Sequence, residues 1–300
     1  MPIIDYHYVR NDKKNTFKLH GYSLNEFKRH LDFLQDKYQI VSLEELAQQK
    51  NQKKDIEKYC SLIFDDGIVD HYENVFPELV SRNIPATFFP IASVFDGKAP
   101  VTIKMHVVFS KIESKIIAEH LEKYIHEKFG DAFPNFKVST TRRINDKFRL
   151  KDDIVTANLK QIISELPLSV KEKFADLLFS AIIKNEKEFC ENFFLQPKHL
   201  KEMRKMGMGI GVHSYNHTSL KSLSFDEQKK DIKKAKNIIE NMLNDKVEMF
   251  SYPFGDCGHD TPRILKDIGF RFGVIYNSQK TSLNDDDLLL SAGEYSDFFK

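Results

Sequence analysis

Net charge and cysteine are scarce in this 300-residue sequence, and each shortage excludes a class of protein. Lys and Arg number 45 against 44 for Asp and Glu, which leaves a formal net charge of +1. Without an excess of positive charge, no long-range field attracts nucleic acid, and we expect no nucleic-acid partner. The three cysteines, Cys60, Cys190 and Cys257, are widely spaced and odd in number, so they indicate neither a disulfide framework nor a cysteine metal site.

Long apolar runs are also missing. No stretch approaches the roughly twenty apolar residues that a membrane helix needs, so we expect no integral membrane segment. The first twenty residues carry six charged side chains and no sustained apolar segment, which argues against a secretory signal peptide. A cytoplasmic protein is the simplest expectation.

What the sequence does contain is enough apolar material for a large core, with 41% hydrophobic and 30% charged residues. We expect a single domain over residues 1–300, either uninterrupted or carrying an insertion. Short strand-like runs alternate with amphipathic segments, several of which open at a Ser-x-x-Glu capping box. This alternation predicts an α/β fold with a parallel sheet, either open or closed into a barrel, whose strands lie near 3–9, 39–41, 60–66, 86–91, 208–212, 247–252 and 272–275.

The alternation stops between residues 96 and 196, where Lys, Glu and helical patterns predominate. We predict a helical insertion over 96–196 within the 1–300 domain. It either stabilises the sheet as a cap or forms a lid that shapes a substrate pocket, and we favour the lid because so long a connection is uncommon without a role.

Two adjacent carboxylates end one of the predicted strands. The apolar run Cys60–Phe64 leads into Asp65, Asp66 and Gly67, as in a buried strand that feeds a functional loop. Neighbouring acids repel each other, so a cation or a shared proton would make the pair tolerable. The alternative is a solvated Asp-Asp-Gly turn.

A pair of histidines follows another predicted strand. His213 and His217 lie four positions apart, and the Ser, Asn and Thr residues around them favour a loop. On a single turn both imidazoles would reach one ion, and two histidines with one carboxylate form a common catalytic zinc set. The alternative is two surface histidines.

In chain order, three motifs carry a resemblance: Phe64-Asp65-Asp66-Gly67, His213-Ser214-x-x-His217 and Tyr252-Pro253-Phe254-Gly255. They are similar to the first three motifs of the polysaccharide deacetylases of the NodB-homology type. The opening Ile4-Asp5-Tyr6-His7-Tyr8 also resembles that family's amino-terminal portion. The resemblance covers about residues 1–95 and 198–280.

The resemblance implies a distorted (β/α) barrel of about seven parallel strands and a metal-dependent hydrolase of non-peptide C–N bonds, which deacetylates an N-acetylated sugar or glycan. It implies that Asp66, His213 and His217 bind a divalent metal, most plausibly Zn²⁺, and that Asp65 is the catalytic base. The Tyr252–Gly255 segment becomes a pocket wall, with Tyr252 and Pro253 as substrate-binding residues and the Phe254 backbone N–H as an oxyanion donor.

Two positions depart from the family pattern. Many members carry an arginine two residues before the proline of the third motif, where this chain has Ser251, and a carboxyl-terminal Leu-x-His motif whose histidine is the general acid. No histidine follows Ile275 here. The proton for the leaving group could come from His106, His259 or Asp65, or from Glu294 if that residue reaches the site. The departures leave two alternatives open: a catalytically inactive carbohydrate-binding protein of the same fold, and a hydrolase of a non-sugar amide.

Overall fold

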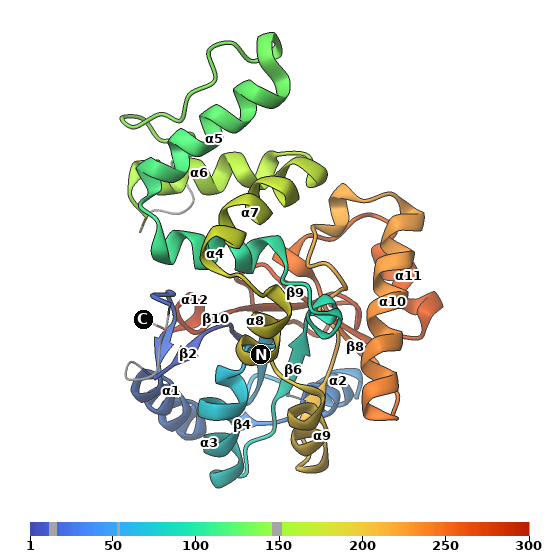
Figure 1. Ribbon diagram of the computed structural model, residues 1–300. Coiled ribbons are helices and arrows are strands. Elements are labelled where there is room, and N and C mark those ends of the chain that lie inside the picture. Colours follow the sequence, from blue (N-terminus) through green and yellow to red (C-terminus); the bar gives the residue numbers. More distant parts are fainter. Residues whose placement is uncertain (12–16, 53–54, 146–151, 300) are drawn as a thin grey trace. The chain divides into compact units, whose positions relative to one another are not determined.

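A computed structural model describes residues 1–11, 17–52, 55–145 and 152–299 (Figure 1). The chain divides into two compact units. The first contains most of the amino-terminal hundred residues and everything from Lys187 onward, and the second is built on Val101–Glu186. Residues 146–151, inside the predicted insertion 96–196, lie outside the described residues. Residues 96–100 and 187–196 belong to the first unit.

Seven parallel strands form the sheet of the first unit, in the order β7-β6-β5-β1-β10-β9-β8. They are β1 (Ile3–Tyr6), β5 (Tyr59–Asp66), β6 (Thr87–Pro90), β7 (Gly209–Ile210), β8 (Met249–Ser251), β9 (Phe272–Tyr276) and β10 (Leu290–Glu294). The short β4 (Gln39–Ile40) pairs with the start of β5, and β2 (Val9–Arg10) pairs separately with β3 (Tyr22–Ser23). The prediction of a distorted barrel of about seven parallel strands is confirmed.

The barrel closes along a seam between the chain after β7 and strand β8. Two backbone hydrogen bonds cross it: the Val212 N–H donates to the Met249 carbonyl at 3.0 Å, and the Ser251 N–H donates to the Val212 carbonyl at 2.9 Å. A single isolated bridge between Val212 and Phe250 therefore joins the two ends of the strand order.

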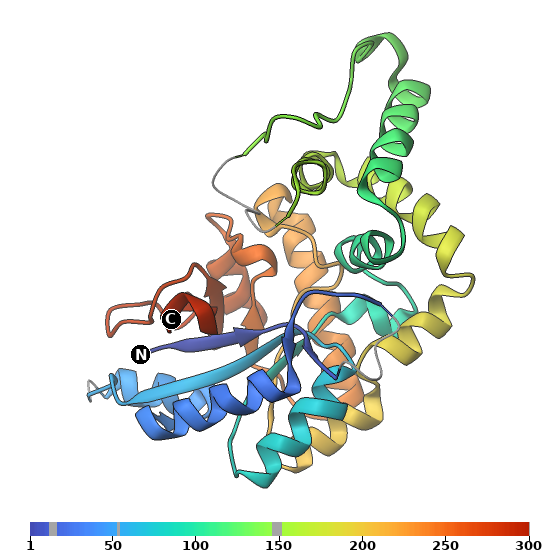
Figure 2. The same cartoon turned by 90° about the vertical axis from the view of Figure 1, so that its left-hand side faces the viewer.

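Helices surround the sheet. They are α1 (Leu24–Lys37), α2 (Leu43–Asn51), α3 (Phe76–Ser81), α8 (Glu186–Phe193), α9 (Pro197–Lys205), α10 (Phe225–Leu243), α11 (Thr261–Ile268) and α12 (Tyr295–Phe298). Figure 2 shows β1 beside β5, with α1 running along them. The predicted capping boxes open α1 at Ser23 and α10 at Ser224, because each serine side chain accepts a hydrogen bond from the Glu amide three residues on.

Strand residues alternate between two cores, as a period of two requires. Ile3, Ile63 and Met249 belong to one buried cluster, which the strands share with α2. The intervening residues, such as Ile4, Leu62 and Phe64, pack in a second cluster with α1, α10 and α11. The inner cluster is apolar toward the amino ends of the strands. Toward the carboxyl ends, the same inward positions carry polar side chains.

One predicted strand boundary differs from the structure, and two helices begin without a side-chain cap. The first strand ends at Tyr6, not Val9. The segment after Asp70 begins with a π-helical turn over His71–Val75, and the Asn74 amide donates to the Val9 carbonyl at 2.8 Å, so Asn74 does not cap α3. Asp260 precedes the first residue of α11, and its side chain makes no capping hydrogen bond.

The second unit is helical, with α4 (Val101–Lys111), α5 (Ser114–Phe129), α6 (Ile154–Glu165) and α7 (Leu168–Ile182). Lys104 is buried, and its ammonium group lies 2.6 Å from Asp176 and 2.8 Å from Glu186. Among the described residues of the chain, none of the helices combines the length and the apolar character that crossing a membrane requires.

Candidate active site

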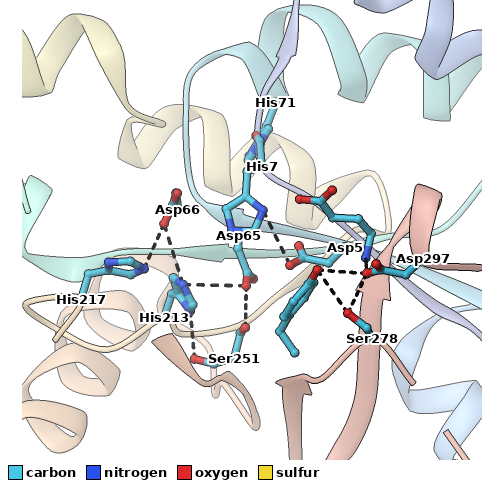
Figure 3. A network of polar contacts seen from close by, with 12 residues as sticks. Asp5, His7, Asp65, Asp66, His71, His213, His217, Ser251, Ser278 and Asp297 are labelled. Carbon is cyan, nitrogen blue, oxygen red and sulfur yellow. Dashed lines mark hydrogen bonds and ion pairs between the residues drawn. The ribbon is translucent and has the colours of Figure 1, made fainter. Parts of the chain in front are cut away.

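The carboxyl end of β5 carries the two aspartates (Figure 3). Asp65 is in phase with Ile63, so it faces the same inner side of the sheet, and it is 5% exposed. Asp66 takes a left-handed backbone conformation, with φ of 70°, and Gly67 follows with φ of 67°. The chain leaves the strand at this turn, which presents both carboxylates at the end of the barrel.

Asp66, His213 and His217 converge as predicted. The Asp66 Oδ1 atom lies 3.4 Å from His217 Nε2 and 3.8 Å from His213 Nε2. One ligand atom from each of the three lies within 4.8 Å of the others, and all three side chains are buried. Because a carboxylate and two imidazoles offer three lone pairs to one point, this group is compatible with a divalent metal.

The hydrogen bonding around the three residues fits a metal. His213 Nδ1 lies 2.9 Å from the Ser251 carbonyl, which can only accept, so Nδ1 carries the hydrogen and Nε2 keeps its lone pair. Asp66 Oδ1 is buried without a hydrogen-bond partner among the described residues. Burial raises the Asp66 pKa, although His7 and His213 act against this. A cation would satisfy this oxygen and stabilise the ionised carboxylate.

A tight loop brings the two histidines together. Ser214 and His217 both have positive φ, at 59° and 52°, and the Ser214 hydroxyl accepts a hydrogen bond from the His217 N–H at 2.9 Å. Asp231, on α10, holds the loop from behind by accepting hydrogen bonds from the backbone N–H groups of Tyr215 at 2.7 Å and Asn216 at 3.1 Å. The predicted turn between the histidines thus depends on a carboxylate outside the motif.

Asp65 has two unlike oxygens. Oδ2 accepts a hydrogen bond from the Ser251 hydroxyl at 2.7 Å and lies 3.7 Å from His213 Nε2. Oδ1 is buried, and the described part of the chain provides it with no hydrogen-bond partner. Ser251 therefore contacts the Asp65 carboxylate from the position at which many polysaccharide deacetylases, the family that the motifs resemble, carry an arginine.

His7 is a site residue that the sequence reasoning missed. It follows β1, the neighbour of β5, and its Nδ1 lies 3.7 Å from Asp5 Oδ2. One polar atom from each of Asp5, His7 and Asp65 lies within 4.8 Å of the others. Burial disfavours a charged His7, but Asp5, Asp66 and Asp65 favour it more strongly, so its pKa rises to about 9. The sequence prediction placed His7 inside a strand that ran to Val9, whereas the strand ends at Tyr6, so His7 was not recognised as a polar residue at a strand end.

The His7 backbone is also held in place. The His71 ring, fully buried, donates from Nε2 to the His7 carbonyl at 2.5 Å. Burial lowers the His71 pKa to about 4, so this imidazole is neutral. It fixes the chain at the point where His7 leaves the strand.

The third motif divides into exposed and buried parts. The Phe254 ring is 53% exposed and lies 4.6 Å from the His217 ring, centroid to centroid. Gly255 and Asp256 donate their amides to the Tyr252 and Pro253 carbonyls, so the Phe254 N–H takes no part in these two turn hydrogen bonds. Phe254 has φ of 62°, a left-handed conformation that is uncommon for a bulky residue.

Tyr252 does not have the position that a substrate-binding side chain requires. It is 1% exposed and packs against Phe250, and its hydroxyl donates to the Leu288 carbonyl at 2.8 Å. The reason is the alternation of β8: Ser251 faces inward, so Tyr252 faces the helices. Pro253 is also buried. Of this segment, Phe254 is the residue whose side chain is exposed beside the histidines.

The other candidates for a proton donor differ in position. The His259 side chain is 98% exposed, beside Asp260. His106 belongs to α4 of the second unit. Glu294 ends β10, and in the parallel pairing of β1 with β10 it lies in register with Asp5. His7, in contrast, is within 4.8 Å of Asp65, measured between polar atoms.

Comparison with known proteins gives a consistent picture. A family model described as polysaccharide deacetylase matches residues 52–115 and 170–273, more than half of the chain. The putative polysaccharide deacetylase YxkH of Bacillus subtilis is 20% identical over 276 residues, which are 91% of this chain and 63% of that protein. The chain thus spans less than two thirds of the length of this curated relative.

Three solved structures share the fold. The deacetylase PplD of Streptococcus pyogenes, solved in complex with acetate, has a TM-score of 0.60 and 18% identity, over 98% of this chain and 91% of that chain. A de-N-acetylase from Aggregatibacter actinomycetemcomitans has a TM-score of 0.56 and 18% identity, over 98% and 93%. IcaB from Ammonifex degensii has a TM-score of 0.55 and 18% identity, over 98% and 90%.

Proposed function

We propose that this chain, which belongs to the polysaccharide deacetylase family, is a metal-dependent N-deacetylase that removes acetyl groups from an N-acetylated sugar or glycan. The observation that carries the proposal is the buried group Asp66, His213 and His217, with the Asp65 carboxylate directly beside it. Three protein ligands leave a position open in a catalytic zinc site, whereas structural zinc is usually held by four.

Asp66 Oδ1 and the Nε2 atoms of His213 and His217 are the ligands in this proposal, and Zn²⁺ is the metal that suits them best. When bound, such an ion polarises a carbonyl group and makes water easier to deprotonate. Asp65 is the general base, because its carboxylate is buried beside the ligand His213, with Oδ2 at 3.7 Å from Nε2, and its Oδ1 has no hydrogen-bond partner among the described residues.

Two further groups act on the acetamide. The Phe254 N–H serves as the oxyanion donor, and the exposed Phe254 ring offers an apolar surface against which a sugar can stack. His7 is the general acid that protonates the departing amine in this proposal. Asp5 orients His7 and stabilises its charged form.

The charges of the buried group support this division of roles. Asp5, Asp65 and Asp66 contribute three negative charges when ionised, and a divalent ion with a protonated His7 contributes three positive ones. Burial makes an unbalanced cluster costly, and with all three carboxylates ionised one divalent ion and one imidazolium leave the site neutral.

The test combines metal analysis with acetate release. Purified protein is stripped with a chelator and reloaded with Zn²⁺, Co²⁺, Ni²⁺ or Mn²⁺. Acetate is then measured with oligomers of N-acetylglucosamine of different linkage, a non-sugar acetamide and an aryl acetate. Bound metal without turnover would identify a binding protein, and turnover restricted to the non-sugar amide would identify the other hydrolase.

Four variants assign the roles. His213→Ala and His217→Ala should each lose most of the metal and the activity, since each removes one of three ligands. Asp65→Asn should keep the metal and lose hydrolysis, whereas Asp66→Asn should lose both. Full metal occupancy in both histidine variants would refute the ligand set, and the reverse behaviour of the two aspartate variants would exchange their roles.

A further inference from the structure

The backbone N–H, the carbonyl and the hydroxyl of Ser251 each form a hydrogen bond to a different part of the site. Its N–H donates to the Val212 carbonyl at 2.9 Å across the barrel seam, and its carbonyl accepts the His213 Nδ1 hydrogen at 2.9 Å. Its hydroxyl donates to Asp65 Oδ2 at 2.7 Å. The side chain is 3% exposed, so water does not compete for these contacts. One residue at the end of β8 thus joins the seam, a metal-ligand histidine and the carboxylate.

The side-chain torsion of Asp65 does not by itself fix the plane of the carboxylate. Rotation about the bond that carries a carboxylate group is soft, with a broad energy profile. A hydrogen bond to one oxygen is directional, and it selects one orientation among those that packing allows. In this structure the bond holds Oδ2, and Oδ1 has no hydrogen-bond partner among the described residues.

We propose that the Ser251 hydroxyl is a positioning group: by donating to Asp65 Oδ2 it fixes the orientation of the carboxylate that takes the proton from water. The inference rests on the proposed function, since it concerns the base of that reaction. Ser251 is a positioning residue and not a catalytic one, because it acts through Asp65. Its neutral hydroxyl orients the base without adding a positive charge that would weaken it.

Removal of the hydroxyl should therefore lower the rate of the chemical step and little else. Ser251→Ala keeps the backbone carbonyl that fixes His213, so metal affinity, measured by competition with a chelator, should be unchanged. KM for a soluble oligomer of N-acetylglucosamine should also be unchanged. We expect kcat to fall about 10- to 100-fold, the cost of a misplaced catalytic group.

Three further variants separate the hydroxyl from packing. Ser251→Thr and Ser251→Val add nearly the same volume, but only the Thr variant keeps the hydroxyl. The kcat of the Thr variant should therefore be at least about tenfold higher than that of the Val variant, because only the Val variant misplaces the Asp65 carboxylate. Ser61→Ala is the matched control, because Ser61 is a fully buried serine in β5 whose hydroxyl donates to the Val41 carbonyl at 2.8 Å, away from the site. It should keep the wild-type kcat.

The outcomes are distinct. Wild-type kcat in Ser251→Ala, equal rates in the Thr and Val variants, or an equal loss in Ser61→Ala would each overturn the proposal. Loss of metal in Ser251→Ala would do so too, because the hydroxyl would then support the ligands and not the base. A wild-type protein that binds metal but releases no acetate would instead refute the proposed function, and the positioning role would fall with it.

Discussion

Replacing His7 by glutamine removes the proposed proton donor while keeping a polar side chain of similar length. General acid catalysis contributes about 10²- to 10⁴-fold, or about 3 to 5 kcal/mol of transition-state stabilisation. The whole of that range should appear with an amide, because an amine cannot leave without a proton. An aryl acetate has a leaving group that departs as an anion, so its hydrolysis should fall less than about tenfold in the same variant.

The structure also predicts whether activity on the amide rises or falls with pH. A general acid works in its protonated form, and the carboxylates around His7 raise its pKa to about 9, so the donor form predominates at neutral pH. Activity on the amide should fall as pH rises through the His7 pKa, and a bound cation moves this limb to a lower pH. His7→Gln should lack the limb.

The assay is acetate release from an N-acetylglucosamine oligomer and from an aryl acetate, across pH 6 to 10, with metal content measured in each variant. His259→Gln and His106→Gln are the matched histidine controls, and both should keep wild-type rates on both substrates. Near-wild-type amide hydrolysis in His7→Gln would show that another group, such as the proton held on Asp65, serves the leaving amine. An equal loss on both substrates would assign His7 a purely structural role.

The remaining predictions concern the support around the site. Asp231→Asn should lower metal affinity about 10- to 100-fold although Asp231 is no ligand, because an amide side chain cannot accept both loop hydrogen bonds. Asp226→Asn, on the exposed side of the same helix, is the control, and its metal affinity in chelator competition should be unchanged. His71 has a folded-state pKa of about 4, against 6.5 in the unfolded chain, so the protein should lose stability as pH falls from 6.5 to 4. Urea titrations should show a loss of up to about 3 kcal/mol in the free energy of unfolding, and a smaller loss in His71→Gln. Within the first unit Gly97 lies against Lys187, so a short linker can replace residues 101–186. If circular dichroism shows that this variant folds, metal binding and aryl acetate hydrolysis should persist, while glycan hydrolysis should fall further. An equal loss of aryl acetate and glycan hydrolysis would place a catalytic group in the insertion.

Local signals in the sequence predicted much of the first unit. The Ser23 and Ser224 capping boxes, and the apolar run that ends at Asp65 and Asp66, each act over a few residues, and the structure has them where they were expected. The turn between His213 and His217 was predicted for the same reason, since Ser and Asn favour turns.

Contacts between distant segments could not be predicted in this way. His7 and Asp65 are 58 residues apart, and they meet because β1 pairs with β5 in the sheet order, which no short pattern encodes. Asp231 supports the histidine loop from a helix that looks, in sequence, like any solvated amphipathic segment. Tyr252 was predictable in principle: if Ser251 faces the barrel interior, its neighbour must face outward.

The barrel seam has a consequence for local unfolding. Among the described residues, two backbone amides donate hydrogen bonds between the chain after β7 and strand β8, and one of them belongs to Ser251. If these strands separate, His213 loses its carbonyl partner at the same moment as Asp65 loses its hydroxyl partner. Hydrogen exchange at the Val212 and Ser251 amides should therefore report on the assembly of the proposed active site. A metal bound only to the closed form should slow exchange at both amides, and the slowing should increase with the ratio of free metal to Kd.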